Sequence, residues 1–214
     1  MHLLLASNNQ HKRRELAEIL ARHTLSTPED YHLEFDHEEI ADTFMGNALG
    51  KAKELHELVA EAHTNRPPIV IADDSGIAVD ALDGRPGVWS ARFGNTPEHP
   101  KLTDEDRNNL LLNTLNDEHN RAAHYVCCMV AYLGVDHYYI VQETWHGEIA
   151  RSPSNGGGGF GYDPVFLLPD LGVTVADISA EEKHRRSHRG KAARRLASLL
   201  DNLELDDFEL GLSR

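Results

Sequence analysis

Residues 69–76 read IVIADDSG, an apolar run rich in β-branched residues that turns polar at Asp73. A continuous apolar run of this length is typical of a strand buried on both faces of a sheet. We expect the strand to end at Asp73 and DDSG to form a turn, which places at least one carboxylate at the sheet edge where open α/β sheets bind ligands. An Asx turn that merely closes a strand accounts for the same four residues equally well.

Helix-like and strand-like segments alternate on both sides of this run. Helical periodicity marks residues 11–23, 43–62, 103–115 and 191–203, and strand-like runs mark residues 2–6, 122–135, 138–150 and 164–169. Asp42 or Thr43 can cap the second helix, and Thr103 with Asp106 has capping-box spacing at the start of the third. The two long strands are close enough in sequence to pair as an antiparallel hairpin. The alternation predicts an α/β fold with a mixed sheet.

Length and composition fit one globular domain that spans residues 1–214. The chain is 40% hydrophobic and 26% charged, and it is long enough to bury most of its apolar surface in a single domain, with or without two lobes. Residues 204–214 are acidic and predict a frayed tail. No apolar run approaches the roughly 20 residues of a membrane helix, and residues 2–6 are too short for a signal-peptide core, so the expected location is the cytoplasm.

The formal charge of −14 argues against a nucleic-acid partner held by a broad basic surface. The charge does not exclude a small phosphorylated ligand. Interactions with charges beyond about 8 Å are largely screened, whereas a lysine about 4 Å from a phosphate attracts it by about 4 kcal/mol. Cys127 and Cys128 lie side by side in an apolar run, which favours a core role over a disulfide or a zinc site. The 14 histidines show no metal-ligand spacing.

Two polar segments have the residues of a phosphate or metal site. Residues 7–12 (SNNQHK) lie between a predicted strand and a predicted helix, where free backbone N–H groups, the helix dipole and Lys12 favour an anion. The pattern G-x-x-x-x-G-K-[ST] is absent, so an ordinary surface turn is the alternative. The adjacent carboxylates Asp73 and Asp74 favour a cation, and Mg²⁺ suits a few oxygen ligands completed by substrate phosphates. Glu39 offers a further carboxylate, although a solvated acidic pair with its neighbour is the alternative.

A glycine-rich stretch precedes an aromatic and acidic cluster. Residues 154–166 read SNGGGGFGYDPVF, and such a run of glycines is either a linker or a backbone that approaches something closely. Phe160 and Tyr162 can pack on a nucleobase, and Asp163 can accept a hydrogen bond. By itself the stretch leaves the linker and the binding site equally open.

Several basic residues stand at predicted helix ends or turns. Lys51, Lys183 and His188 would each be an ordinary surface residue in most proteins. The segment SHRG, residues 187–190, interrupts a helical pattern and predicts that Arg189 is presented from a turn. A guanidinium group in that position suits bidentate contacts or stacking on a base.

Five segments, in order, resemble the inosine triphosphate pyrophosphatase family of non-standard purine nucleoside triphosphate pyrophosphatases. They are ASNNQHKRREL, EEIADTFMGNALGKA, ADDSGIAVDALDGRPGVWSARFG, GGFGYDPVF and ISAEEKHRRSHRGKA, and they span residues 6–192. The resemblance implies an elongated α/β fold with a long, twisted mixed sheet flanked by helices, two lobes, a central cleft and a homodimer. It also implies hydrolysis of ITP, dITP and XTP between the α and β phosphates, with Mg²⁺, to the monophosphate and pyrophosphate.

The resemblance assigns roles to residues of all five segments. Asp74 would be the catalytic carboxylate and a magnesium ligand, and Glu39 the second metal ligand. The triphosphate side would consist of Ser7, Asn8, Asn9, Gln10, His11, Lys12, Lys51 and Ser75, and the base and sugar side of Phe160, Gly161, Tyr162, Asp163, Lys183, His188 and Arg189. Two departures stand out: the first turn reads SNN where many members read TGN, and the glycine run is about one residue longer than usual.

Two other functions remain as alternatives. One is a related pyrophosphatase of the septum-inhibitor type that acts on modified pyrimidine nucleotides, although the segments SHRGKA and FGYDP favour purines. The other is a nucleotide-binding regulator without turnover, which the joint presence of Lys12, Glu39 and Asp74 disfavours. Within the proposed site, the glycines fit the wall of a pocket, and residues 155–157 are a hypothetical flap that orders when substrate binds.

Overall fold

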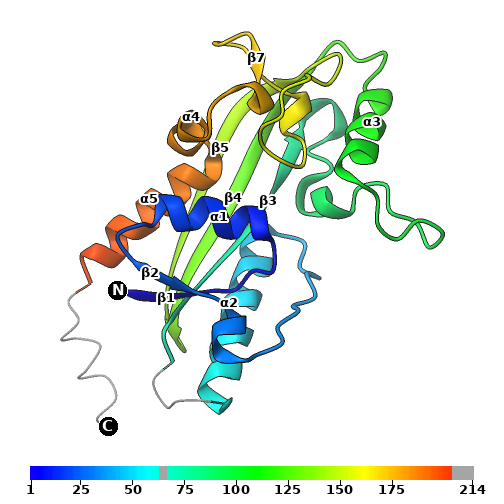
Figure 1. Cartoon of the computed structure of the whole chain (residues 1–214). Helices are drawn as coiled ribbons and strands as arrows, with labels where there is room; N and C mark the ends of the chain where they lie inside the picture. Colours follow the sequence, from blue (N-terminus) through cyan, green and yellow to red (C-terminus); the bar gives the residue numbers. More distant parts are fainter. Residues whose placement is uncertain (63–66, 204–214) are drawn as a thin grey trace.

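The computed structural model describes residues 1–62 and 67–203, which form a mixed seven-stranded sheet flanked by helices (Figure 1). The strands are β1 (His2–Leu5), β2 (Thr24–Ser26), β3 (Ile69–Val79), β4 (Ala122–Gly134), β5 (His137–Ile149), β6 (Phe166–Leu168) and β7 (Val173–Thr174). The α-helices are α1 (Gln10–Ile19), α2 (Phe44–Ala62), α3 (Asp104–Thr114), α4 (Ala180–Arg186) and α5 (His188–Asp201). In the order β2-β1-β3-β4-β5-β6-β7, the first two pairs are parallel and the later pairs antiparallel. The predicted α/β fold with a mixed sheet is confirmed.

Local signals set several element ends where they were predicted. The Thr43 hydroxyl accepts a hydrogen bond from the Gly46 N–H at 3.0 Å, as expected of a cap for α2. Thr103 and Asp106 form the predicted capping box of α3. β4 and β5 pair as the predicted antiparallel hairpin. The predicted tail, residues 204–214, lies outside the described residues, and no helix within those residues is long and apolar enough to cross a bilayer.

β3 is longer than the sequence predicts. The polar residues predict an end at Asp73, whereas the strand continues through DDSG to Val79. Asp73 and Asp74 pair with Met129 and Cys128 of β4, so the Asx-turn alternative is also wrong. The buried strand tolerates these polar side chains because both aspartates have hydrogen-bond or ionic partners.

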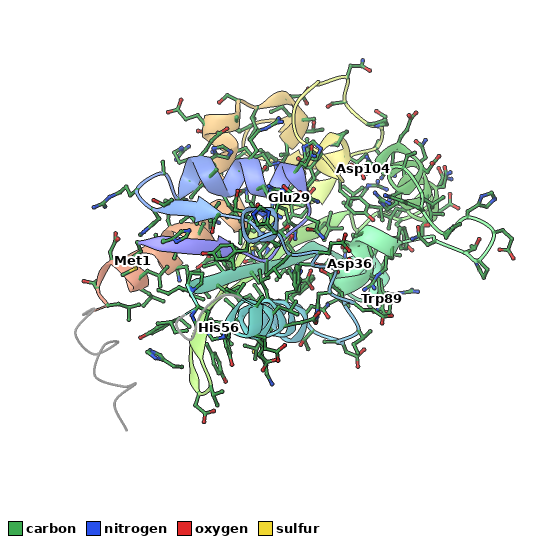
Figure 2. The ribbon with its side chains drawn as sticks, turned by 60° about the horizontal axis from the view of Figure 1, so that its bottom comes forward. Met1, Glu29, Asp36, His56, Trp89 and Asp104 are labelled. Carbon is green, nitrogen blue, oxygen red and sulfur yellow. The ribbon has the colours of Figure 1, made fainter. Side chains whose placement is uncertain are left out.

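Helices cover both faces of the sheet around β1 and the first half of β3. On one face, α1 and α5 pack over Ile69 and Ile71 of β3, and on the other face α2 packs over Val70 and Ala72. Figure 2 shows α1 and α2 on opposite sides of these strands. A separate apolar cluster fills the other end of the sheet, between α3 and strands β3 to β6. The two cysteines of β4 are fully buried and unpaired, which confirms their predicted core role.

The junction between α4 and α5 corrects the predicted turn at SHRG. The chain breaks only at Ser187, which ends α4 and caps α5 by accepting the Gly190 N–H at 3.0 Å. A side chain at Gly190 would collide with the carbonyl oxygen of His184, so glycine allows the two helices to meet closely. Arg189 is therefore presented from the first turn of α5, and it is buried.

Candidate active site

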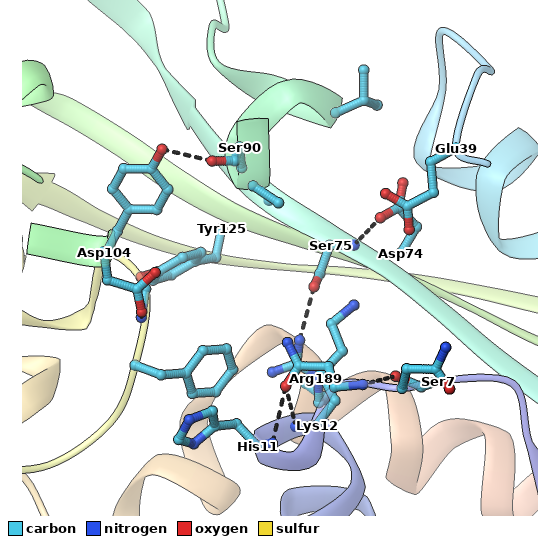
Figure 3. A pocket seen from close by; sticks show the side chains of 18 of the residues that line it. Ser7, His11, Lys12, Glu39, Asp74, Ser75, Ser90, Asp104, Tyr125 and Arg189 are labelled. Carbon is cyan, nitrogen blue, oxygen red and sulfur yellow. Dashed lines mark hydrogen bonds between the residues drawn. The ribbon is translucent and has the colours of Figure 1, made fainter. Parts of the chain in front are cut away.

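A cavity of about 670 Å³ lies between the β1–α1 turn, the middle of β3, the glycine loop (residues 154–161) and the start of α5 (Figure 3). Its size is that of a small-molecule site. The predicted site residues that line it are Ser7, Asn8, Asn9, His11, Lys12, Glu39, Lys51, Asp74, Ser75, Phe160, Gly161, Tyr162, Asp163, Lys183, His188 and Arg189. Gln10 is exposed and does not line the cavity.

Side chains of the β1–α1 turn accept hydrogen bonds from several of the turn's own backbone N–H groups. Asn9 caps α1, since its Oδ1 accepts the N–H groups of His11 and Lys12 at 2.9 and 3.1 Å. The Asn9 N–H in turn donates to Ser7 Oγ at 3.2 Å. Asn8 stands where the resembling family often has glycine, and its side chain donates to a main-chain carbonyl of the loop before α2. The amides of His11 and Lys12 are therefore not free, contrary to the prediction, and this part of the turn offers the cavity side chains.

The Lys51 ammonium group lies close to the carboxylates of Glu39 and Asp74 at one end of the cavity. Its Nζ lies 2.6 Å from Glu39 Oε1 and 4.0 Å from Asp74 Oδ1. The same ammonium group donates to the main-chain oxygen of Asp73 at 2.8 Å. Burial opposes the charged form, but the three acidic neighbours together raise the pKa of Lys51. Lys51 therefore remains a cation, as is needed beside a phosphate.

Asp74 and Glu39 have pKa values shifted in opposite directions. Burial raises the pKa of Asp74, and the Glu39 carboxylate adds to this rise against the opposing effect of Lys51. Burial also disfavours the ionised form of Glu39, but Lys51 holds the pKa of Glu39 below its usual value. Asp74 accepts hydrogen bonds from Asn47 Nδ2 and the Ser75 N–H, both at 2.9 Å. An oriented carboxylate with a raised pKa, facing a cavity, has the properties of a general base.

The two carboxylates suit a magnesium ion. The described residues contain no group of three or more His, Cys, Asp or Glu side chains arranged for a metal, so they offer no cage made by the protein alone. Mg²⁺ is commonly held by one or two carboxylates, with water and substrate phosphates completing its shell. The effect of Glu39 on the pKa of Asp74 is a repulsion that a cation between them would relieve. The donor set therefore fits the predicted metal.

Phe160 forms the aromatic end of the cavity. His11 of α1 stacks on the Phe160 ring, with centroids 5.0 Å apart and planes inclined by 17°. Lys183 Nζ lies 4.6 Å from the ring centroid, and Arg189 Cζ lies 5.7 Å from it. An aromatic ring beside cations is suited to a nucleobase. His11 therefore lies at this aromatic end through its side chain, although it belongs to the turn that was predicted to hold phosphate (Figure 3).

Tyr162 and Asp163 hold the glycine loop in place. Tyr162 is only 5% exposed, and its hydroxyl donates to the carbonyl of Ser90 at 2.8 Å. The Asp163 carboxylate accepts the Phe160 N–H at 2.8 Å and Lys183 Nζ at 2.7 Å. Both side chains reach the cavity lining, but their polar groups already have partners within the protein.

His188 and Arg189 come from the first turn of α5. The His188 ring stacks on Tyr125, with centroids 4.6 Å apart and planes inclined by 7°. Burial, together with the Arg189 and Lys183 cations, holds the pKa of His188 well below its usual value, so the imidazole is neutral at physiological pH. Arg189 Nη2 donates to Ser75 Oγ at 2.8 Å. This contact ties α5 to β3 at the wall of the cavity.

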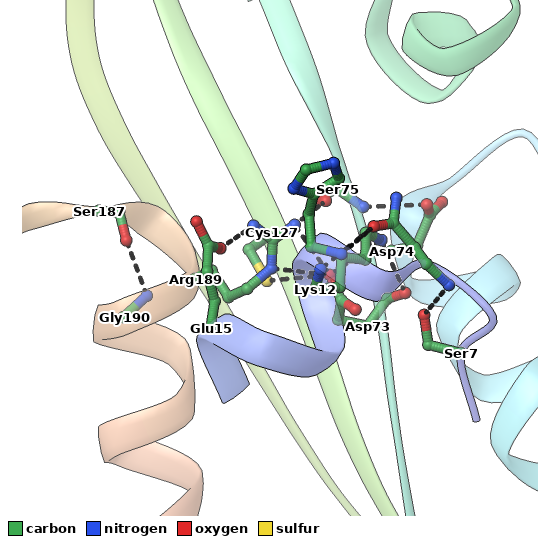
Figure 4. A network of polar contacts seen from close by, with 12 residues as sticks. Ser7, Lys12, Glu15, Asp73, Asp74, Ser75, Cys127, Ser187, Arg189 and Gly190 are labelled. Atoms are coloured by element: carbon green, nitrogen blue, oxygen red, sulfur yellow. Dashed lines mark hydrogen bonds and ion pairs between the residues drawn. The ribbon is translucent and has the colours of Figure 1, made fainter. Parts of the chain in front are cut away.

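Two acidic side chains beside the cavity depart from the prediction. Glu15, which is partly buried, was not predicted, and Asp73, which is fully buried, was predicted only as half of a cation-binding pair with Asp74. Glu15 of α1 forms ion pairs at 2.7 Å with both Lys183 and Arg189. Asp73 pairs with Lys12 at 3.0 Å and with Arg189 at 3.3 Å (Figure 4). Glu15 lies one helical turn after Lys12, and this spacing is the one signal that points to it. Asp73 has no signal that separates it from its neighbour in the sequence.

The start of α3 also reaches the cavity without having been predicted. Asp104 and Arg107 of α3 line the cavity, together with Lys101 from the chain just before the helix. Asp104 accepts the Gly161 N–H at 2.7 Å, and Asn108 Nδ2 donates to the Gly161 carbonyl at 3.0 Å. Both main-chain polar groups of Gly161 are thus held by α3, at a residue with a φ of 63°. The helix fixes the path of the glycine loop.

The glycine loop packs against the chain that follows β7. The Gly158 N–H donates to the carbonyl oxygen of Ala176 at 3.1 Å, and a side chain at Gly156 would collide with the same oxygen. A Cβ at Gly157 would meet no atom within 4 Å. The glycines therefore allow one stretch of backbone to lie close to another, and of this loop only Phe160 and Gly161 line the cavity. The pocket-wall interpretation holds for those two residues and not for Gly156 to Gly158. A flap at residues 155–157 stays a prediction, to be checked by hydrogen exchange with and without a non-hydrolysable ITP analogue.

The Ham1 family model matches residues 3–199, which is nearly the whole chain. The chain belongs to the Ham1 family. A dITP/XTP pyrophosphatase of Treponema denticola is 44% identical over 192 residues, which cover 90% of this Ham1-family chain and 94% of the relative. A dITP/XTP pyrophosphatase of Nitrosomonas europaea is 42% identical over 205 residues, which cover 94% of this chain and 95% of the relative.

Solved structures share the fold of this Ham1-family chain. The Ham1 protein of Staphylococcus aureus superposes with a TM-score of 0.80 at 34% identity, covering 94% of this chain and 98% of that one. A protein of Mycobacterium abscessus, titled nucleoside-triphosphatase / dITP/XTP pyrophosphatase, superposes with a TM-score of 0.70 at 37% identity, covering 94% of this chain and 99% of that one. The fold that the resemblance implied is confirmed over nearly the full length.

Proposed function

We propose that this Ham1-family chain hydrolyses ITP, dITP and XTP between the α and β phosphates, releasing the nucleoside monophosphate and pyrophosphate. The observation that carries the proposal is the layout of one cavity, with Glu39, Asp74 and Lys51 at one end and Phe160 with Lys183 at the other. A triphosphate needs cations and a carboxylate-bound metal, and a base needs an aromatic face. The names of the relatives support dITP and XTP as substrates. The enzyme would remove deaminated purine nucleotides before polymerases use them.

In the proposed reaction, water attacks the α phosphorus, the bond to the α–β bridging oxygen breaks, and pyrophosphate leaves. Asp74 takes the proton of the attacking water, a role that its raised pKa supports. The hydrogen bond from Asn47 orients the carboxylate for this transfer. Lys12 and Lys51 stabilise the charge on the phosphate oxygens. When bound by Glu39 and Asp74, Mg²⁺ supplies further charge neutralisation at those oxygens.

Base selection would depend on the 6-oxo group that hypoxanthine and xanthine share. A site that hydrogen-bonds this group leaves buried partners unpaired when adenine enters, and such mismatches can reduce activity by about 10⁴- to 10⁵-fold. Lys183 and Arg189 are cationic donors placed beside the Phe160 ring. Guanine also has the 6-oxo group and differs from hypoxanthine only by its 2-amino group. We therefore expect weaker discrimination against GTP than against ATP.

Pyrophosphate release from ITP, XTP, dITP, GTP, ATP and dUTP, with Mg²⁺ present, tests this function. We expect kcat/KM for ITP, dITP and XTP to exceed the values for ATP and dUTP by at least about 100-fold, with GTP in between. A preference for dUTP would favour the pyrimidine-directed alternative. Nucleotide binding without release would favour a regulator. Equal rates on all six nucleotides would contradict the base specificity.

The raised pKa of Asp74 predicts an acid limb in the pH profile. A base acts only when ionised, so kcat/KM for ITP should fall as the pH drops through a pKa that lies above the ordinary value of 3.8. Bound Mg²⁺ favours the ionised carboxylate, so more metal should move the limb to lower pH. The check is kcat/KM from about pH 4 to pH 8 at limiting and saturating Mg²⁺. A limb that does not move with metal concentration would assign it to another group.

The homodimer and the cytoplasmic location belong to the same proposal. The buried free cysteines support a reducing compartment. The formal charge of −14 supports a small-molecule substrate rather than a nucleic acid. Light scattering of the purified chain tests the dimer, which is supported by the resemblance.

A further inference from the structure

The neighbours Asp73 and Asp74 lie on opposite faces of β3. Asp74 lines the cavity, whereas the side chain of Asp73 is fully buried and does not line it. Ile71 packs under α1 and α5 and Ala72 packs under α2, so the alternation of the strand turns Asp73 toward α1 and α5. Asp73 is therefore placed to act on the cavity through other side chains.

Asp73 gathers cations that line the cavity. Its Oδ2 lies 3.0 Å from Lys12 Nζ and 3.3 Å from Arg189 Nη2 (Figure 4). Its main-chain oxygen accepts a hydrogen bond from Lys51 Nζ at 2.8 Å. The three cations come from α1, α5 and α2, and Asp73 is a contact that they share. Its position thus links three helices at the floor of the cavity.

One oxygen of Asp73 carries its ion pairs. Within the part of the chain that the structure describes, Oδ1 is buried and has no hydrogen-bond partner. A buried carboxylate is tolerated only when its charge is paired, and here the pairing depends on Lys12 and Arg189. The dependence is mutual, because the long side chain of Lys12 has many rotamers and the contact with Asp73 holds one of them.

We propose that Asp73 is a positioning residue that holds Lys12 in the arrangement that receives the triphosphate, without touching the substrate. This inference rests on the proposed function, since it assigns Lys12 to the phosphates. Groups that are ordered before binding lower the ordering cost of binding. Loss of Asp73 therefore weakens binding of the phosphate part of the ligand. Binding of the base stays unchanged, because Arg189 keeps its ion pair with Glu15 at 2.7 Å and its hydrogen bond to Ser75 Oγ at 2.8 Å.

Asp73→Asn tests this assignment in the full chain with Mg²⁺ present. We expect the Kd for pyrophosphate, measured by calorimetry, to rise at least about tenfold, while the Kd for inosine, measured by NMR titration, changes less than about twofold. Asp163→Asn is the matched control, because Asp163 is also a buried aspartate paired with a lysine, Lys183, at 2.7 Å. That variant should lose inosine and keep pyrophosphate. A rise below about threefold for pyrophosphate in folded Asp73→Asn would overturn the proposal.

The double variant Lys12→Met/Asp73→Asn covers the case in which Asp73→Asn does not fold. It removes the ammonium group that would otherwise be left unpaired. Its Kd for pyrophosphate should stay within about threefold of that of Lys12→Met, because the contact that Asp73 serves is already gone. A larger further loss would overturn the proposal. These binding measurements need no turnover. A wild-type chain that binds pyrophosphate but hydrolyses no nucleotide would contradict the proposed function, and the assignment of Asp73 would still be decided by the pyrophosphate Kd values.

Discussion

Asp74→Asn should lower kcat for ITP by about 10²- to 10⁴-fold, the usual contribution of a general base. The amide has nearly the size of the carboxylate and keeps an oxygen for the Ser75 N–H, which is 2.9 Å away in the wild type, so we expect the fold to persist. The change also weakens one of the two proposed metal ligands, and the assay is therefore run at saturating Mg²⁺. Steady-state pyrophosphate release over a range of ITP concentrations separates kcat from KM.

Asp80→Asn is the matched control for this experiment. Asp80 follows directly after β3 and is exposed, and it does not line the cavity. Its replacement should leave kcat and KM at their wild-type values. Near-normal turnover of Asp74→Asn at saturating Mg²⁺ would remove the role of base from Asp74.

Gly159→Ala should raise KM for ITP by about 30- to 150-fold, which corresponds to about 2–3 kcal/mol of binding free energy. Gly159 has a φ of 75°, a left-handed conformation that costs other residues about 1–2 kcal/mol. An added Cβ would also collide with Asp163 Oδ2, the oxygen that holds the Phe160 N–H and Lys183 Nζ. The aromatic end of the cavity would therefore be displaced. Initial rates over a range of ITP concentrations measure the change.

Gly157→Ala controls for the loss of glycine as such. An added Cβ at Gly157 meets nothing within 4 Å, and its backbone is not left-handed, so this variant should bind ITP as the wild type does. Equal losses in both variants would show that loop flexibility is the important property. A wild-type KM for Gly159→Ala would show that the contact with Asp163 does not shape the base end.

Features with a local signal in the sequence were predicted well. The apolar run at residues 2–6, the capping box at Thr103 and the hairpin of β4 and β5 each depend on neighbours in the chain, and all three are confirmed. The cavity residues were predicted through motifs, and all but Gln10 line the cavity. Their combination in one family made the prediction possible, since each motif alone allowed an ordinary surface residue.

Features that depend on distant partners were not predicted. DDSG has the composition of a turn, and its place inside β3 depends on groups such as Arg189, which lies 116 residues after Asp73 and donates to its carboxylate. Tyr162 was predicted to be a ring available to a base, but its hydroxyl binds the carbonyl of Ser90, 72 residues earlier. Neither partner can be identified from the residues around these positions.

The unbroken pleat of β3 restricts which changes of chain length this site can survive. Inserting or deleting one residue between Ile69 and Ala72 would turn each aspartate to the opposite face of the sheet, so that Asp73 would point away from α1 and α5 and the proposed base would point toward them. A change of two residues would restore the faces but displace both carboxylates by about 7 Å along the strand. The number of residues that precede the aspartates in β3 is therefore under the same functional constraint as the aspartates themselves.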